Sequence, residues 1–331
     1  MNLELSVEQR LLAETARAFV DRQTDDDPWP TIAAAGWCGL LAPEDLGGAG
    51  AGMVEMTLVC EALGRGPVYS PLIASGVVAT LAMSHDRLPE IASGARVGTL
   101  AVLEEGMRDE WDSVRMGGGP TLTGTKLLVP WAETADLFVV LTDDGLFLVE
   151  AATSGVTVAP HEALGEEPLA AVVFTDAPAE PLGPLGNQLD HAAVAHLAFA
   201  VGAAERALEL AVQHAKDRHQ FGRPIGSFQA VAHRCAEMRA EVDACRYLAY
   251  QAAWFLDHQP ETAEIAVTAA KSYANDAIRR VFLHAHQVHG AIGFSTEYPL
   301  HRFTRCAKAF ELSHGSTARH RDRLATAMGL A

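Results

Sequence analysis

The chain is short of positive charge. Its 331 residues include 25 Lys and Arg against 42 Asp and Glu, a formal net charge of −17 at pH 7. A protein that binds nucleic acid along its general surface carries the opposite balance, so we exclude that class. The same negative field disfavours polyanionic ligands. Any phosphate site therefore has to be a local cluster of Arg side chains and backbone N–H groups.

Long apolar runs and paired cysteines are also lacking. No stretch of about eighteen uncharged apolar residues occurs, so we expect no membrane span. The start, Met-Asn-Leu-Glu-Leu, has no basic region followed by an apolar stretch, and we expect no signal peptide. The five cysteines form no C-x-x-C pair, and their odd number is typical of a reducing compartment. These features predict a cytoplasmic protein.

Histidine is plentiful, but no metal-binding pattern accompanies it. Of the 14 histidines, His284, His286 and His289 lie close together in a helical stretch. Their spacings do not bring three rings to one face of a helix, and no carboxylate-rich zinc pattern surrounds them. We expect no metal site.

Three segments differ in their periodicity. Residues 1–95 are predicted to be helical, with one helix from Met53 to Leu63 that Gly64 ends. Residues 96–185 contain short β-type runs separated by Gly, Pro and Asp, as in a small barrel or sandwich. Residues 186–331 contain long helical blocks that predict a bundle. The runs cover 98–103, 121–129, 136–141, 146–150 and 171–175, and the long blocks cover 189–218, 228–256 and 261–289. The predicted fold class is α+β.

The stretch Arg218-His-Gln-Phe-Gly-Arg-Pro-Ile-Gly-Ser-Phe-Gln229 is predicted to be a loop between two long helices. An Arg side chain such as Arg218 can hold a pyrophosphate by forked, charge-assisted hydrogen bonds. Phe221 offers a face for stacking a purine, and Gly222 lets the backbone approach a ligand. The alternative is an ordinary helix-to-helix turn whose Arg is solvated.

This stretch resembles the signature of the acyl-CoA dehydrogenase family. A second stretch of the same kind is Gln287-Val-His-Gly-Ala-Ile-Gly-Phe-Ser-Thr-Glu-Tyr-Pro-Leu-His-Arg302. The opening Leu-Ser-Val-Glu-Gln-Arg, the run Gly36-Trp-Cys-Gly-Leu-Leu-Ala-Pro-Glu-Asp-Leu-Gly-Gly-Ala-Gly and Glu61-Ala-Leu-Gly-Arg65 agree as well. The resemblance therefore covers essentially the whole chain in the right order.

The resemblance implies a fold and a cofactor. The expected domains are an N-terminal helical domain, a central β domain and a C-terminal four-helix bundle, with FAD bound across a subunit interface. Arg218, Gln220 and Phe221 would reach the pyrophosphate and adenosine half of an FAD held mainly by the neighbouring subunit. The other positions that match cofactor-binding residues of the family are Gln229, Gln287 and Gly290.

Both usual positions of the family's catalytic base differ in this chain. The reaction needs a carboxylate to take the α-proton of an acyl-CoA. The family's Glu near the C-terminus corresponds to His314, in the run Leu312-Ser-His-Gly-Ser-Thr317. The base that some relatives carry on the first bundle helix corresponds to Ala192. Nearby Glu311 is predicted to be a solvated helix carboxylate.

The β domain departs from the family pattern too. The stretch Val102-Leu-Glu-Glu-Gly-Met-Arg-Asp-Glu-Trp-Asp lacks the Gly-Ser-Asp run that contacts flavin and substrate in many relatives. Leu128 replaces the Trp that flanks the flavin ring, and Pro130 replaces the hydroxyl residue. A proline cannot offer even a backbone donor there.

The chain thus resembles the base-lacking subunit of the heteromeric acyl-CoA dehydrogenases of bacterial steroid breakdown. We expect it to share an FAD site with a homologous subunit in a heterotetramer and to be catalytically silent by itself. An acyl-CoA is the expected substrate, and an electron-transfer flavoprotein the expected electron acceptor. One alternative is a homo-oligomeric enzyme with a displaced base, His314, which would become cationic on accepting a proton. Another is a scaffold that has kept the fold and lost flavin.

Overall fold

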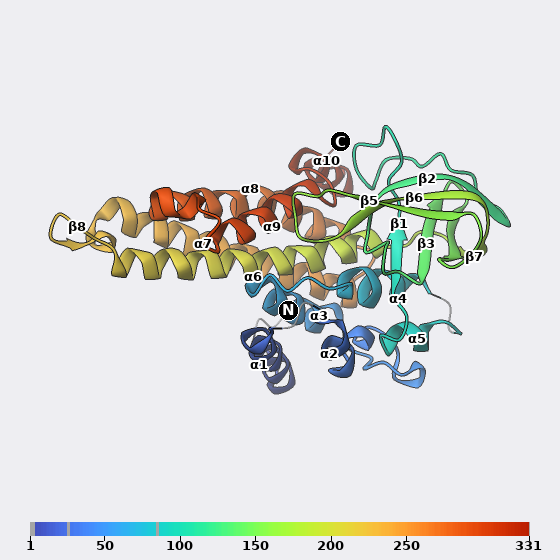
Figure 1. Cartoon of the computed structure of the whole chain (residues 1–331), viewed down its shortest axis with the longest axis horizontal. Coiled ribbons are helices and arrows are strands. Elements are labelled where there is room, and N and C mark those ends of the chain that lie inside the picture. Colours follow the sequence, from blue (N-terminus) through green and yellow to red (C-terminus); the bar gives the residue numbers. More distant parts are fainter. Residues whose placement is uncertain (1–3, 25–26, 84–85, 331) are drawn as a thin grey trace.

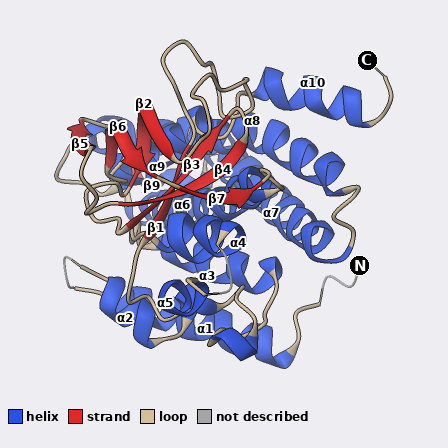
Figure 2. Ribbon diagram, turned by 90° about the vertical axis from the view of Figure 1, so that its right-hand side faces the viewer, coloured by secondary structure: helices blue, strands red, loops and turns tan. Residues whose placement is uncertain are grey.

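The computed structural model describes residues 4–24, 27–83 and 86–330. Helices come first along the chain, then two sheets, then long helices, so the predicted order is confirmed. The long helices lie along the longest axis of the molecule, and the β domain lies at one end of them (Figure 1). The N-terminal helices lie beneath the long helices (Figures 1 and 2).

The C-terminal segment is a helical bundle built on three long helices. The predicted blocks are confirmed, with ends that differ by one or two residues. The helices are α6 (Gln188–Asp217), α7 (Gln229–His258), α8 (Ala263–His289), α9 (Leu300–Leu312) and α10 (Thr317–Ala327). Helix α6 is the central one, because it contacts α3, α7, α8 and α9. Its mostly small apolar side chains are buried on most sides of the helix.

The N-terminal segment is a set of shorter helices. They are α1 (Val7–Arg22), α2 (Trp29–Ala34), α3 (Met53–Arg65), a buried π-helical turn (Ile73–Ala79), α4 (Thr80–Ala82) and α5 (Leu88–Ala92). A capping box begins α1: Ser6 Oγ accepts the Gln9 N–H at 3.2 Å, and Gln9 Oε1 accepts the Ser6 N–H at 2.9 Å. The first N–H groups of α3 are satisfied from α7, because Asp257 Oδ1 accepts the Met53 N–H at 2.8 Å.

Helix α3 crosses α6 at very close range. The predicted end of α3 at Gly64 is wrong, since the helix continues past it. A Cβ atom at Gly64 would lie 1.9 Å from the carbonyl oxygen of Phe199, and one at Gly202 would lie 1.9 Å from that of Glu61. Both glycines are therefore present because a side chain would not fit between the two backbones.

An ion-pair network reinforces this crossing. Arg246 on α7 donates to Glu61 on α3 at 2.9 Å and lies 3.1 Å from Glu205 on α6. Tyr250 donates its hydroxyl to the other oxygen of Glu61 at 2.7 Å. These charges are nearly buried, and their pairing with one another offsets the cost of removing them from water.

The β domain is an open sandwich of two sheets. One sheet has the order β1 (Gly98–Ala101), β3 (Leu137–Thr142), β4 (Gly145–Glu150) and β7 (Glu180–Gly183). The other has the order β2 (Thr121–Pro130), β6 (Leu169–Pro178) and β5 (Val156–His161). Phe138 and Phe174 meet edge to face between the sheets, with centroids 6.0 Å apart. The prediction left a small barrel and a sandwich open, and the described strands form the sandwich rather than a closed barrel.

Strands β5 and β7 were not predicted. Strand β5 is a mostly exposed edge strand that contains Pro160, and its apolar alternation is limited to Val156 and Val158, which is too short to predict a strand. Strand β7 falls in a Pro- and Gly-rich stretch just before the helical bundle. Both lie at sheet edges, where little apolar surface is buried.

Candidate functional site

The predicted loop after α6 is a small β-hairpin. Strands β8 (His219–Gln220) and β9 (Arg223–Pro224) pair antiparallel, and Phe221-Gly222 forms the turn. Both turn residues have positive φ, 52° and 78°, as a type I′ turn requires. The hairpin projects beyond the end of the bundle farthest from the β domain (Figure 1).

Phe221 has an unfavourable position by two criteria. Its side chain is 91% exposed, and its backbone is left-handed, a conformation that a non-glycine residue adopts at a cost of about 1–2 kcal/mol. Its ring lies roughly perpendicular to that of Phe228, with 6.1 Å between the ring centroids. Strain and apolar exposure at one residue point to a bound group or partner that uses the ring.

All the predicted cofactor-binding residues are exposed. They are Arg218, Gln220, Phe221, Gln229, Gln287 and Gly290. Arg218 caps the C-terminus of α6, and its N–H donates to the carbonyl of His214 at 2.9 Å. Among the residues that the structure describes, none forms a hydrogen bond or ion pair with its guanidinium group. The cation is therefore available to an anionic group outside the chain.

The second sequence stretch lies beside the first. Helix α8 ends at His289, and Gly290 follows with φ 65° and ψ −139°, a conformation that glycine adopts most readily. The ring of His289 stacks on that of His214 in the last turn of α6, with centroids 4.9 Å apart. Burial lowers the pKa of both imidazoles, and Arg218 lowers that of His214 further. The contact between these two rings places the C-terminal ends of α6 and α8 side by side, so the two stretches begin at neighbouring helix ends.

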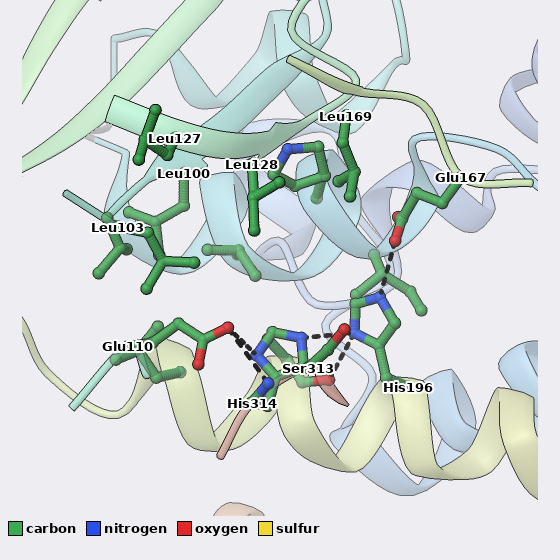
Figure 3. A pocket seen from close by; sticks show the side chains of 17 residues that line it. Leu100, Leu103, Glu110, Leu127, Leu128, Glu167, Leu169, His196, Ser313 and His314 are labelled. Carbon is green, nitrogen blue, oxygen red and sulfur yellow. Dashed lines mark hydrogen bonds and ion pairs between the residues drawn. The ribbon is translucent and has the colours of Figure 1, made fainter. Parts of the chain in front are cut away.

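A pocket lies at the other end of α6, where the three segments meet (Figure 3). Most of its lining is apolar, from the π-helical turn, the β domain and the start of α6. Ala192 and His314, which the resemblance places at the two positions of the family's base, both line it. Leu128 and Pro130, which the resemblance places at the flavin-flanking positions, line it as well. These four residues thus lie around one pocket and bring no carboxylate of their own.

Four polar side chains form a chain across the floor of the pocket. Glu167 Oε2 lies 3.6 Å from His196 Nε2, His196 Nδ1 lies 3.0 Å from His314 Nε2, and Glu110 Oε1 lies 3.8 Å from His314 Nδ1 (Figure 3). Burial raises the pKa of Glu110 and lowers that of His314 well below its usual value. The neighbouring His196 and Lys271 lower the pKa of His314 further.

The hydrogen bonds assign the tautomers of the two histidines. His196 Nδ1 also lies 3.0 Å from the carbonyl oxygen of Ala192, which can only accept, so Nδ1 carries the hydrogen. His314 Nε2 is then the acceptor, and a neutral His314 carries its own hydrogen on Nδ1. Its one lone pair is directed at His196, away from any ligand in the pocket.

The loop between β1 and β2 brings Glu110 into the pocket. A buried ion pair organises this loop: Lys126 Nζ donates to Glu104 at 2.7 Å, and Glu104 accepts the Met116 N–H at 3.0 Å. Farther along, Trp111 packs edge-on against His320, whose pKa burial lowers to about 4. The loop is thus fixed to the C-terminal helices.

Sequence reasoning missed Glu110, His196 and Glu167. His196 follows Ala192 by one helical turn, so the i, i+4 spacing could have placed it in the same pocket. Glu110 and Glu167 lie in irregular loops, where no periodicity indicates the direction of a side chain.

Glu311 forms an ion pair with Lys308 at 3.1 Å.

The three histidines considered as metal ligands, His284, His286 and His289, have separate partners. His284 lies 3.5 Å from Glu237, His286 contacts the Thr304 hydroxyl and His289 contacts Tyr298. Within the described ranges no group of three or more His, Cys, Asp or Glu side chains could hold a metal ion. In the same part of the chain, none of the helices has the length and apolar character to cross a membrane.

Known proteins match the chain over nearly its whole length. Residues 6–88 match the family model of the acyl-CoA dehydrogenase N-terminal domain, and residues 185–329 that of the C-terminal domain. The acyl-CoA dehydrogenase FadE27 of Mycobacterium tuberculosis is 32% identical, over 89% of this chain and 86% of its own length.

Solved structures agree with this. A variant of the Tcur3481–Tcur3483 steroid acyl-CoA dehydrogenase is 30% identical with a TM-score of 0.89, covering 97% of this chain and 98% of that chain. The ChsE4–ChsE5 complex from Mycobacterium tuberculosis gives 28% identity and a TM-score of 0.89, with full coverage of both chains. The chain therefore belongs to the acyl-CoA dehydrogenase family of FAD-dependent oxidoreductases.

Proposed function

We propose that this chain is a subunit of a heteromeric, FAD-dependent acyl-CoA dehydrogenase, and that it supplies the adenosine end of an FAD site completed by a homologous partner. The observation that carries the proposal is the separation of its two half-sites. The hairpin begins at Arg218, 22 residues after His196, which corresponds to about 33 Å along an α-helix. The hairpin and the pocket of one chain therefore face different FAD molecules.

The hairpin end fits the adenosine half of FAD. Arg218, with a free guanidinium, would bind the pyrophosphate, and Phe221 would stack on the adenine. Three exposed side-chain amides would complete this surface, those of Gln220, Gln229 and Gln287. The exposed backbone at Gly290 would contribute as well. When bound, FAD supplies the hydride acceptor that dehydrogenation of an acyl-CoA requires.

The pocket end fits the flavin ring poorly. The side chains of Leu128 and Pro130 offer no hydrogen bond to a ring, and Pro130 has no backbone N–H. Leu128 has φ 51°, is 48% exposed and lines the pocket. Neither Ala192 nor His314 provides a carboxylate. His314 is a weak proton acceptor, because its lone pair is engaged and burial disfavours its cation. These features support a subunit that lacks its own base.

The relatives support a two-component enzyme. The ChsE4–ChsE5 and Tcur3481–Tcur3483 structures are named for pairs of proteins, and the second is named a steroid enzyme. By analogy, we propose a heterotetramer in the cytoplasm that acts on an acyl-CoA of a steroid or lipid pathway. An electron-transfer flavoprotein is the proposed electron acceptor.

Flavin absorbance of the chain, purified alone and then with a co-expressed homologue that carries the family's Glu, tests the proposal. We expect flavin only in the mixed complex. Arg218→Ala in that complex should weaken FAD binding by roughly 10- to 150-fold, as for loss of a charge-assisted hydrogen bond. Arg22→Ala, an exposed Arg at the end of α1, is the matched control and should change nothing.

The other outcomes separate the alternatives. Flavin bound by the chain alone, with dehydrogenation of an acyl-CoA, would overturn the proposal and favour a homo-oligomeric enzyme with His314 as base. Absence of flavin from both preparations would favour the scaffold.

A further inference from the structure

A stacked pair of histidines lies directly behind the proposed adenosine site. His214 is in the last turn of α6, and His289 is the last residue of α8. Their rings stack with 4.9 Å between centroids and 26° between planes. This contact joins two helix ends, and the residues Arg218, Gln287 and Gly290 beside them are exposed.

The orientation of His289 is fixed on both sides of its ring. Nδ1 lies 2.7 Å from the carbonyl oxygen of Ala285, which can only accept, so Nδ1 carries the hydrogen. Nε2 then accepts the hydroxyl hydrogen of Tyr298 at 2.9 Å. With both nitrogens bonded and the side chain buried, His289 cannot turn without losing a hydrogen bond.

The stack sets the distance between the two exposed segments. Arg218 follows His214 by one helical turn and donates its N–H to the carbonyl of His214. Gln287 and Gly290 lie two residues before and one residue after His289. A change in the stack would therefore move the guanidinium of Arg218 relative to the amide of Gln287.

We propose that His214 and His289 are positioning residues for FAD, which hold the Arg218 segment and the Gln287–Gly290 turn at the spacing that the adenosine diphosphate half requires. This inference rests on the proposed function. Neither ring touches the cofactor in this proposal, and both act through the backbone segments that follow or flank them.

The test compares two substitutions at one position in the mixed complex. His214→Ala removes the ring, while His214→Phe keeps a flat ring that can stack. Because aromatic pairs contribute modestly, we expect His214→Ala to raise the Kd of FAD by roughly two- to tenfold and His214→Phe to restore it. Flavin fluorescence during reconstitution of the flavin-free complex measures the Kd.

A second readout separates positioning from general destabilisation. ADP alone, used as a competitor of FAD, should lose affinity by the same factor as FAD in His214→Ala, while acyl-CoA affinity stays unchanged. His258→Ala is the matched control, because His258 stacks on Trp254 at 4.7 Å near the far end of α7. It should leave the affinity for FAD and ADP unchanged.

Two results would overturn the inference. One is an unchanged Kd for FAD in His214→Ala, and the other is a loss in His214→Phe as large as in His214→Ala. Failure of the proposed function looks different, because Arg218→Ala would then bind FAD as tightly as the unsubstituted complex does. Loss of FAD in Arg218→Ala with none in His214→Ala would refute the inference alone.

Discussion

Phe221→Asn should have opposite effects on the stability of the free chain and on FAD binding. The residue occupies the first turn position of the β8–β9 hairpin, with φ 52°, and its ring is 91% exposed. The substitution creates Asn-Gly, which type I′ turns prefer. It also removes the ring proposed to stack on adenine.

The two magnitudes follow from separate contacts. A left-handed backbone costs a bulky residue about 1–2 kcal/mol, and Asn tolerates it better, so the turn should gain up to about 1 kcal/mol. Stacking of a base on an aromatic side chain contributes about 1–3 kcal/mol, so FAD affinity should fall by roughly 5- to 150-fold. The two effects have opposite signs because the strained backbone of Phe221 destabilises the free chain, while its exposed ring is available to stack on adenine in the complex with FAD.

Thermal unfolding of the flavin-free chain and FAD titration of the mixed complex measure the two effects. Phe294→Asn is the control for stability, since Phe294 is also exposed but has no left-handed backbone. It should not stabilise the chain. Unchanged FAD affinity in Phe221→Asn would refute the stacking, and a less stable chain would refute the argument from strain.

Three further predictions concern the interior. Glu61→Gln should destabilise the chain by about 1.5–3 kcal/mol in chemical denaturation, because it weakens the charged hydrogen bonds from Arg246 and Tyr250 while Glu205 and Asp243 still pair with Arg246. The pKa of His320 falls from 6.5 to about 4 on folding, so the stability that its neutral form contributes is complete above pH 6.5. About 3 kcal/mol of it should be lost as the pH falls towards 4, and urea titrations of His320→Phe should show a smaller loss. His314→Glu should not make the chain a dehydrogenase by itself. Its melting temperature should be lower than that of the unsubstituted chain at neutral pH and should recover on acidification, because the new carboxylate lies beside Glu110. The melting temperature of His314→Gln should show no such recovery.

Most of the fold could be predicted from periodicity. Long helices such as α6 bury continuous apolar faces, and central strands such as β3 are fully buried, so both leave strong patterns. The edge strands β5 and β7 bury little apolar surface, so their sequences carry no pattern strong enough to predict a strand. The prediction that Gly64 ends α3 was wrong because the local sequence does not distinguish a glycine needed for close helix packing from one that ends a helix.

The candidate site could be predicted in part. The hairpin residues Arg218 and Phe221 lie three residues apart in the sequence. The resemblance singled out Ala192 and His314 as the two positions of the family's base, and in the structure both line one pocket. The carboxylates of Glu110 and Glu167 enter that pocket from loops whose paths depend on tertiary contacts. The stack of His214 on His289 joins residues 75 positions apart, and no local pattern announces such a contact.

The glycine crossing of α3 and α6 has a consequence for biosynthesis. Gly64 and Gly202 lie 138 residues apart in the chain, with the whole β domain between them. At typical translation speeds, α6 leaves the ribosome roughly 7–28 s after α3. During that interval α3 has α1 beside it but not α6, so the apolar surface that α6 will cover stays open. We therefore expect the nascent chain to be a client for chaperones that bind exposed apolar helices until the bundle is complete.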